Sequence, residues 1–170
     1  MEVRHDGVVI HYVTAGKGNP ILFLHGLGGR LENWSLQIAE FRQTRRVIAV
    51  DLSGHGRSSG REISFLDYWR WIEALLDHLG LESATLCGFF KGSRAGLMLA
   101  TRRPARVSRM IVVNAFLHLT NEDAERRRDL YDLLTLGDGG VRWAEAPLDL
   151  MGGARSPGHR PRLPSVARGD

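Results

Sequence analysis

Residues 84–102, ATLCGFFKGSRAGLMLATR, decide the fold of this 170-residue chain. The apolar run from Ala84 to Cys87 has the length of a buried strand. The segment Gly88-Phe89-Phe90-Lys91-Gly92 ends the strand, and a helix is predicted from about Ser93 to Arg102, because Pro104 cannot continue it. A strand that turns sharply into a helix is part of a β-α-β unit, so this stretch predicts an α/β protein.

The same alternation of strand and helix extends to both sides of this stretch. Short apolar runs predict strands, and segments with apolar residues at helical spacing predict helices. Such alternation favours right-handed crossovers, and therefore a mainly parallel sheet with helices on both faces. The predicted strands are Val8 to Val13, Ile21 to Leu24, Val47 to Val50 and Met110 to Val113, and the predicted helices are Leu31 to Phe41 and Phe65 to about Leu79, the latter with Ser64 and Gly80 as its caps.

Two glycine-containing loops follow the upstream strands. The first, residues 25–29, reads HGLGG, and the second, residues 51–58, reads DLSGHGRS. Together with the turn at residues 88–92, in this order, they make the chain resemble the α/β-hydrolase fold superfamily over about residues 1–114. Taken alone, the first loop could also be a plain glycine-rich turn. In the second loop, Asp51 and the glycines are expected to shape the turn, and His55 and Ser58 are expected to be structural.

The resemblance implies that residues 88–92 form the nucleophile elbow, G-x-S-x-G, whose central residue attacks the substrate. Gly88 and Gly92 would permit the close approach of strand and helix, and the backbone N–H groups of Leu27 and Lys91 would form the oxyanion hole. The central residue here is Phe90. A phenyl ring has no lone pair for nucleophilic attack, so nucleophilic catalysis is excluded at this position.

The neighbouring side chains are poor replacements. Ser93 lies about 4.5 Å further along the helix axis, at 1.5 Å per residue, and is expected to form hydrogen bonds at the helix start. Cys87 is expected to be a small buried hydrophobe, since reactive cysteines need exposure and a lowered pKa. The Lys91 side chain is expected to be solvated. None of these three side chains is predicted to be catalytic.

The remaining triad members are also missing. In the resembled family, the acid and the histidine lie on loops after later strands, and no further strand is recognisable after Val113. Asp138, Asp149, His118 and His159 lack the strand-then-loop setting that such residues require. We therefore expect a sheet truncated after the fifth recognisable strand and no intact catalytic residue.

The C-terminal third of the chain has a different character. Residues 115–151 are predicted to begin a helical cap-like region, with Asn121 capping a charged helix to about Leu136. Residues 152–170 contain nine Gly, Pro or Ser residues and four arginines, and are predicted to be a disordered basic tail. This tail accounts for most of the net charge of +4. Its composition is more typical of a shifted reading frame than of an evolved linker.

These observations limit the possible functions. The resemblance implies an esterase-like or lactonase-like hydrolase that acts on a small ester-like molecule without a cofactor, and Phe90 implies that this chain is inactive. The alternative is a non-catalytic binding protein that uses the residual pocket or the sheet edge. Binding of nucleic acid through the arginine-rich tail is a third and weaker interpretation.

The composition also limits the expected metal centres, partners and location of the protein. The chain has one cysteine and no apolar run long enough to span a membrane, so we expect no metal centre, no membrane partner and a cytoplasmic location. We also expect self-association through the strand Met110 to Val113, because such an edge recruits other strands.

Overall fold

The computed structural model of the protein describes residues 1–59 and 67–115. The chain divides into two units, Met1–Leu117 and His118–Asp170, and every described residue belongs to the first. The predicted cap-like region, the basic tail, the Ser64 helix cap, His118, His159, Asp138 and Asp149 lie outside the described residues. No helix in the described ranges combines the length and the apolar character needed to cross a membrane.

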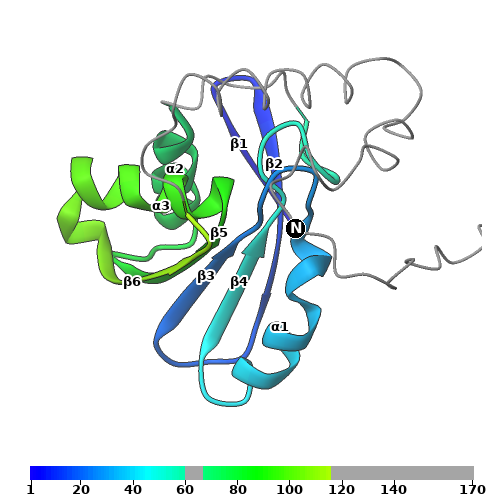
Figure 1. The fold of residues 1–170 in the computed structure, drawn as a ribbon, viewed down its shortest axis with the longest axis vertical. Coiled ribbons are helices and arrows are strands. Elements are labelled where there is room, and N and C mark those ends of the chain that lie inside the picture. The colour runs from blue at the N-terminus through cyan, green and yellow to red at the C-terminus, as the bar shows by residue number, and fades with distance from the viewer. Residues whose placement is uncertain (60–66, 116–170) are drawn as a thin grey trace, which may run out of the picture. The chain divides into compact units, whose positions relative to one another are not determined.

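Six strands form one sheet, in the order β1-β2-β4-β3-β5-β6 (Figure 1). β1 pairs antiparallel with β2 and β2 with β4, whereas the β4–β3, β3–β5 and β5–β6 pairs are all parallel. The predicted mainly parallel sheet is therefore confirmed. The strands are β1 Glu2–His5, β2 Val8–Ala15, β3 Pro20–Leu24, β4 Arg46–Val50, β5 Ala84–Phe89 and β6 Val107–Val113.

Helices cover both faces of the sheet, as predicted. Residues on a strand alternate between the two faces, so Leu22 and Leu24 of β3 belong to one core cluster and Ile21 and Phe23 to the other. The first cluster includes residues from α2 and α3, and the second lies beneath η1 and α1; Figure 1 shows α1 separated from the α2–α3 pair by the sheet. The helices are η1 Leu31–Trp34, α1 Ser35–Phe41, α2 Tyr68–His78, α3 Lys91–Arg102 and η3 Pro104–Arg106.

Several boundaries differ from the predicted ones. The helix predicted over Leu31 to Phe41 is a 3₁₀ turn followed by an α-helix that begins at Ser35. The helix after the elbow begins at Lys91, two residues earlier than expected, because the turn occupies a single residue. β1 was not predicted, because Glu2–His5 is short and has one buried apolar residue; its pairing with β2 stabilises it as a strand.

Candidate functional site

The elbow lies at the carboxyl end of β5, where the strand turns directly into α3. Phe90 caps this helix with φ 52° and ψ −106°, a conformation that favours glycine. Its backbone N–H donates to the carbonyl oxygen of Val113 at the end of β6, at 2.9 Å. The residue at the position expected for the nucleophile is therefore a phenylalanine in a strained backbone conformation.

The elbow glycines allow backbone segments to approach more closely than a side chain would permit. A Cβ on Gly92 would overlap the carbonyl group of Leu24, at the end of β3, and would lie 2.7 Å from the His25 carbonyl oxygen. A Cβ on Gly88 would lie 2.5 Å from the Cα of Ser93. The start of α3 is therefore packed directly against the ends of β3 and β5.

The loop after β3 lies against the elbow. A Cβ on Gly26 would lie 2.8 Å from the ring of Phe89 and 3.3 Å from the Cβ of Phe90. Beside this contact is a hollow of about 380 Å³ at the carboxyl ends of β3, β5 and β6. In open α/β sheets, ligands bind at this end of the strands. The hollow is lined by residues 25–29, Asn33, Trp34, Gln37, Phe89 and Val113.

His25, the first residue of the loop, is held in one tautomer. Its Nε2 accepts the backbone N–H of Leu52 at 2.9 Å, so Nδ1 carries the proton and donates to the Gly26 carbonyl oxygen at 2.6 Å. Burial lowers the pKa of His25 from 6.5 to about 4, and nearby His55 and Lys91 act in the same direction. His25 is therefore a neutral structural histidine whose only lone pair is already occupied.

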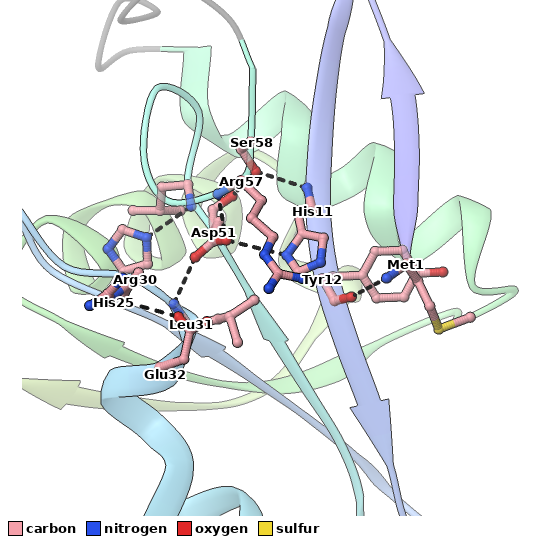
Figure 2. Close-up of polar contacts among 11 residues, drawn as sticks. Met1, His11, Tyr12, His25, Arg30, Leu31, Glu32, Asp51, Arg57 and Ser58 are labelled. Carbon is pink, nitrogen blue, oxygen red and sulfur yellow. Dashed lines mark hydrogen bonds and ion pairs between the residues drawn. The ribbon is translucent and has the colours of Figure 1, made fainter. Parts of the chain in front are cut away.

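Asp51 connects three segments of the chain: β2, the start of η1 and the loop after β4 (Figure 2). Its buried carboxylate accepts the backbone N–H of Leu31 at 2.8 Å and that of Arg57 at 2.9 Å, and contacts Nδ1 of His11 at 3.2 Å. Ser58 donates to the Asp51 carbonyl oxygen at 2.6 Å and accepts the backbone N–H of His11. The Asp51 carboxylate thus fixes the start of η1 relative to β2 and to its own loop.

The structural interpretations of Ser93, Cys87 and His55 agree with the contacts of these residues. The Ser93 hydroxyl donates to the Gly88 carbonyl oxygen at 2.5 Å and accepts the backbone N–H of Val113 at 3.2 Å. Cys87 is buried, and burial raises the pKa of its thiol. Nδ1 of His55 contacts the Ser53 carbonyl oxygen at 3.0 Å.

Lys91 contradicts one expectation. Its side chain is buried, not solvated, and its ammonium group lies 4.8 Å from the centre of the Tyr68 ring. Tyr68 belongs to α2, so the aromatic face that receives the charge comes from a segment distant in sequence. The sequence carried no local signal for this contact. Neither did it indicate that His11 would meet Asp51, 40 residues away.

The proposed oxyanion-hole residues lie on the two segments that meet at the elbow. Leu27 follows Gly26 in the loop and lines the hollow, and Lys91 is the first residue of α3. Within residues 1–59 and 67–115, no group of three or more His, Cys, Asp or Glu side chains is placed to hold a metal ion. The arrangement thus comprises a hollow, a glycine-rich loop and an elbow that carries a phenyl ring.

A tight strand–turn–helix elbow beside a glycine-rich loop, at the carboxyl edge of a mostly parallel sheet, defines a hydrolase-type α/β protein. The family model described as alpha/beta hydrolase fold matches residues 19–159. The chain belongs to this family. The family resemblance expected from the three motifs is therefore confirmed.

The relatives of this chain include several kinds of hydrolase. It is 34% identical to 3-oxoadipate enol-lactonase 2 of Acinetobacter baylyi, over 71% of this chain and 47% of the relative. It is 33% identical to epoxide hydrolase 4 of Mus musculus, over 67% of this chain and 33% of the relative. A solved carboxylesterase structure from Nitrososphaera gargenis shares the fold, with a TM-score of 0.81, 24% identity, and coverage of 91% of this chain and 60% of that one. The chain spans less than half the length of these two curated relatives.

Proposed function

We propose that this chain is a hydrolase-family protein that binds uncharged, ester-like small molecules at the elbow without cleaving them. The observation that carries the proposal is Phe90 at the centre of the elbow. An acyl-enzyme requires a bond from a side-chain oxygen, sulfur or nitrogen to the substrate carbonyl carbon, and a phenyl ring offers none of these atoms.

The environment of the elbow supports the absence of turnover. The Ser93 hydroxyl is buried and engaged with the backbone of Gly88 and Val113. The Cys87 thiol is buried with a raised pKa, which disfavours the reactive thiolate. The Nε2 lone pair of His25 already accepts the Leu52 N–H, so His25 cannot take a proton from a nucleophile.

The lining of the hollow supports an uncharged ligand. Among the described residues that line it there is no Asp, Glu, Lys or Arg, and His25 is neutral above a pH of about 4. Trp34, Phe89 and Val113 supply apolar surface, and Asn33 and Gln37 supply amide groups. A charged ligand would lose its hydration in such a site without gaining an ion pair.

The absence of turnover is tested with p-nitrophenyl acetate and a fluorophosphonate probe. We expect no hydrolysis above the background that an oxyanion hole alone can produce, roughly 10³–10⁴ over water. Phe90→Ser is expected to remain inactive, because a serine without a general base is a poor nucleophile. Turnover by the unaltered chain, or probe labelling traced to Ser93 by mass spectrometry, would contradict the proposal. Efficient turnover by the Phe90→Ser variant would reveal a base outside the described residues.

Ligand binding is tested with two fluorescent probes that share one ring system. N-phenylnaphthylamine is uncharged, and anilinonaphthalenesulfonate carries an added sulfonate. We expect the uncharged probe to bind at least about tenfold more tightly, which corresponds to ~1.4 kcal/mol. Val113→Trp, which fills the hollow, should weaken its binding, whereas Val112→Trp on the opposite face of β6 should not. Equal affinity for both probes, or equal effects of the two variants, would refute this assignment of the ligand.

A further inference from the structure

The hollow beside the elbow is lined by two aromatic side chains, Trp34 and Phe89. The ring of Trp34 packs against the ring of Phe23, with 4.9 Å between the ring centres and 33° between the ring planes, and Phe23 is 1% exposed. The Nε1 atom of Trp34 is buried, so this side chain presents ring carbons to the hollow. Trp34 therefore forms an apolar wall that is supported from behind.

The ring of Phe89 is also restricted in its position. One edge of the ring meets the loop after β3, where a Cβ on Gly26 would lie 2.8 Å and 3.2 Å from two of the ring carbons. The ring centre lies 6.3 Å from that of Phe90. The Phe89 side chain is nevertheless 42% exposed, so a ligand in the hollow can contact it. A surface that is ordered in advance costs less entropy when a ligand binds.

Two such rings favour a flat aromatic ligand over an aliphatic ligand of the same size. Both kinds of ligand gain from the burial of apolar surface, but only the aromatic ring gains the additional energy of offset-stacked or edge-to-face contacts. The hollow of about 380 Å³ is near the lower end of the range for ligand sites, roughly 300–1,000 Å³. The lining therefore suits a small aromatic molecule.

Asn33 adds a polar group whose orientation is fixed by the chain. Its Oδ1 accepts the backbone N–H of Arg30 at 2.7 Å, so Nδ2 is the amide atom that remains for other contacts. In the described part of the chain, Nδ2 has no acceptor. An amide nitrogen carries two N–H donors. Because Asn33 lines the hollow, it can donate to the carbonyl oxygen of a ligand there.

We propose that the ligand of the hollow is a small aromatic carbonyl compound, such as an aryl ester. Its ring packs against Phe89 and Trp34, and its carbonyl oxygen accepts a hydrogen bond from Nδ2 of Asn33. This inference rests on the proposed function, because it names the ligand of the same site.

The first experiment compares methyl benzoate with methyl cyclohexanecarboxylate by ligand-detected NMR titration of the full chain. The two esters differ only in whether the ring is aromatic, and we expect methyl benzoate to bind at least about fivefold more tightly. Equal affinity of the two esters would overturn this inference and leave the proposed function intact. If neither ester binds, N-phenylnaphthylamine separates the two proposals: its binding would overturn only this inference, and its failure to bind would refute the proposed function as well.

The contact with the Phe89 ring is tested with a matched pair of variants. Phe89→Leu should weaken the binding of methyl benzoate about fivefold and leave that of methyl cyclohexanecarboxylate nearly unchanged. Phe41→Leu is the control, at a ring that is 40% exposed and does not line the hollow, and it should change neither affinity. Equal effects of the two variants on methyl benzoate would contradict the packing of its ring on Phe89.

The contact with Asn33 is tested with propylbenzene as the reference compound, since it has the ring without the carbonyl group. Asn33→Asp keeps an acceptor for the Arg30 N–H and removes the Nδ2 donor, so it should weaken the binding of methyl benzoate about fivefold more than that of propylbenzene. Gln37→Glu adds the same charge at another lining residue and should affect the two compounds alike. If Asn33→Asp also affects them alike, the hydrogen bond from Asn33 to the ligand is excluded.

Discussion

The neutral, buried His25 makes the stability of this protein depend on pH in a defined window. The residue is 1% exposed, and its pKa is lowered to about 4 by burial. Protonation would remove the acceptor of the Leu52 N–H and place a charge in the core. The perturbation is His25→Gln, because a glutamine side-chain oxygen can still accept a hydrogen bond but does not titrate.

The direction of the effect follows from the two pKa values. In the unfolded chain His25 titrates near 6.5, and in the folded chain it titrates near 4. Between these pH values the unfolded state carries a proton on His25 and the folded state does not. The contribution of His25 to stability is complete above pH 6.5 and is lost progressively as the pH falls from 6.5 to 4. A difference of about 2.5 in pKa is worth about 3 kcal/mol, at 1.36 kcal/mol per unit, and about 2 kcal/mol of this is lost between pH 7.5 and pH 5.0.

The assay is urea denaturation at pH 7.5 and pH 5.0, followed by tryptophan fluorescence. The free energy of unfolding of the unaltered chain should fall by about 2 kcal/mol more than that of the His25→Gln variant. His5→Gln, at a side chain that is 39% exposed, is the control and should retain the pH dependence of the unaltered chain. If His25→Gln and the unaltered chain lose the same stability between the two pH values, the assignment of a neutral, hydrogen-bonded His25 is wrong.

Two further predictions concern the elbow and the loop after β4. Phe90→Gly and Phe89→Gly should both lower the free energy of unfolding, and the loss should be about 1–3 kcal/mol smaller for Phe90→Gly, because only this variant relieves the strained φ of 52°. Urea denaturation of the two variants measures the difference, and equal losses would contradict the strain. Asp51→Asn should destabilise the protein by about 2–4 kcal/mol, because the Asp51 carboxylate accepts two backbone N–H groups in the core. The control is Asp77→Asn on the surface, which should change stability by less than about 1 kcal/mol. Comparable losses in the two variants would show that the Asp51 contacts contribute little.

Local patterns predicted most of the sheet and the position of the elbow. Ala84 to Cys87 and Ile21 to Leu24 are short, mainly apolar runs that end in glycine-containing turns, and the interactions that make them strands act within a few residues. β1 escaped prediction because it has only four residues and a single buried apolar side chain, Val3, so the pairing with β2 decides that this segment is a strand. The first residue of α3 was misplaced because Phe90 alone makes the turn.

The parts of the site that depend on distant contacts could not be predicted. A lysine after a turn is ordinarily solvated, yet Lys91 is buried and its ammonium group lies over the ring of Tyr68 in α2. The Asp51 carboxylate was expected to shape its own turn, yet it also accepts the N–H of Leu31, 20 residues away. Such pairings depend on how the elements pack together, which no short stretch of sequence specifies.

The elbow shows how the turn from β5 to α3 is held with a phenyl ring at its centre. The turn at Phe90 is held by groups that do not involve the central side chain: the Phe90 N–H bond to Val113, the Ser93 hydroxyl bond to Gly88, and the packing of Gly92 on Leu24. Together these contacts offset the strain of one residue at positive φ. The strand and the helix therefore retain their geometry with a phenyl ring at the centre. Nucleophilic chemistry at this site would require both a different central side chain and a general base. The turn itself is held by contacts that do not involve the central side chain, so a substitution at Phe90 leaves these contacts in place.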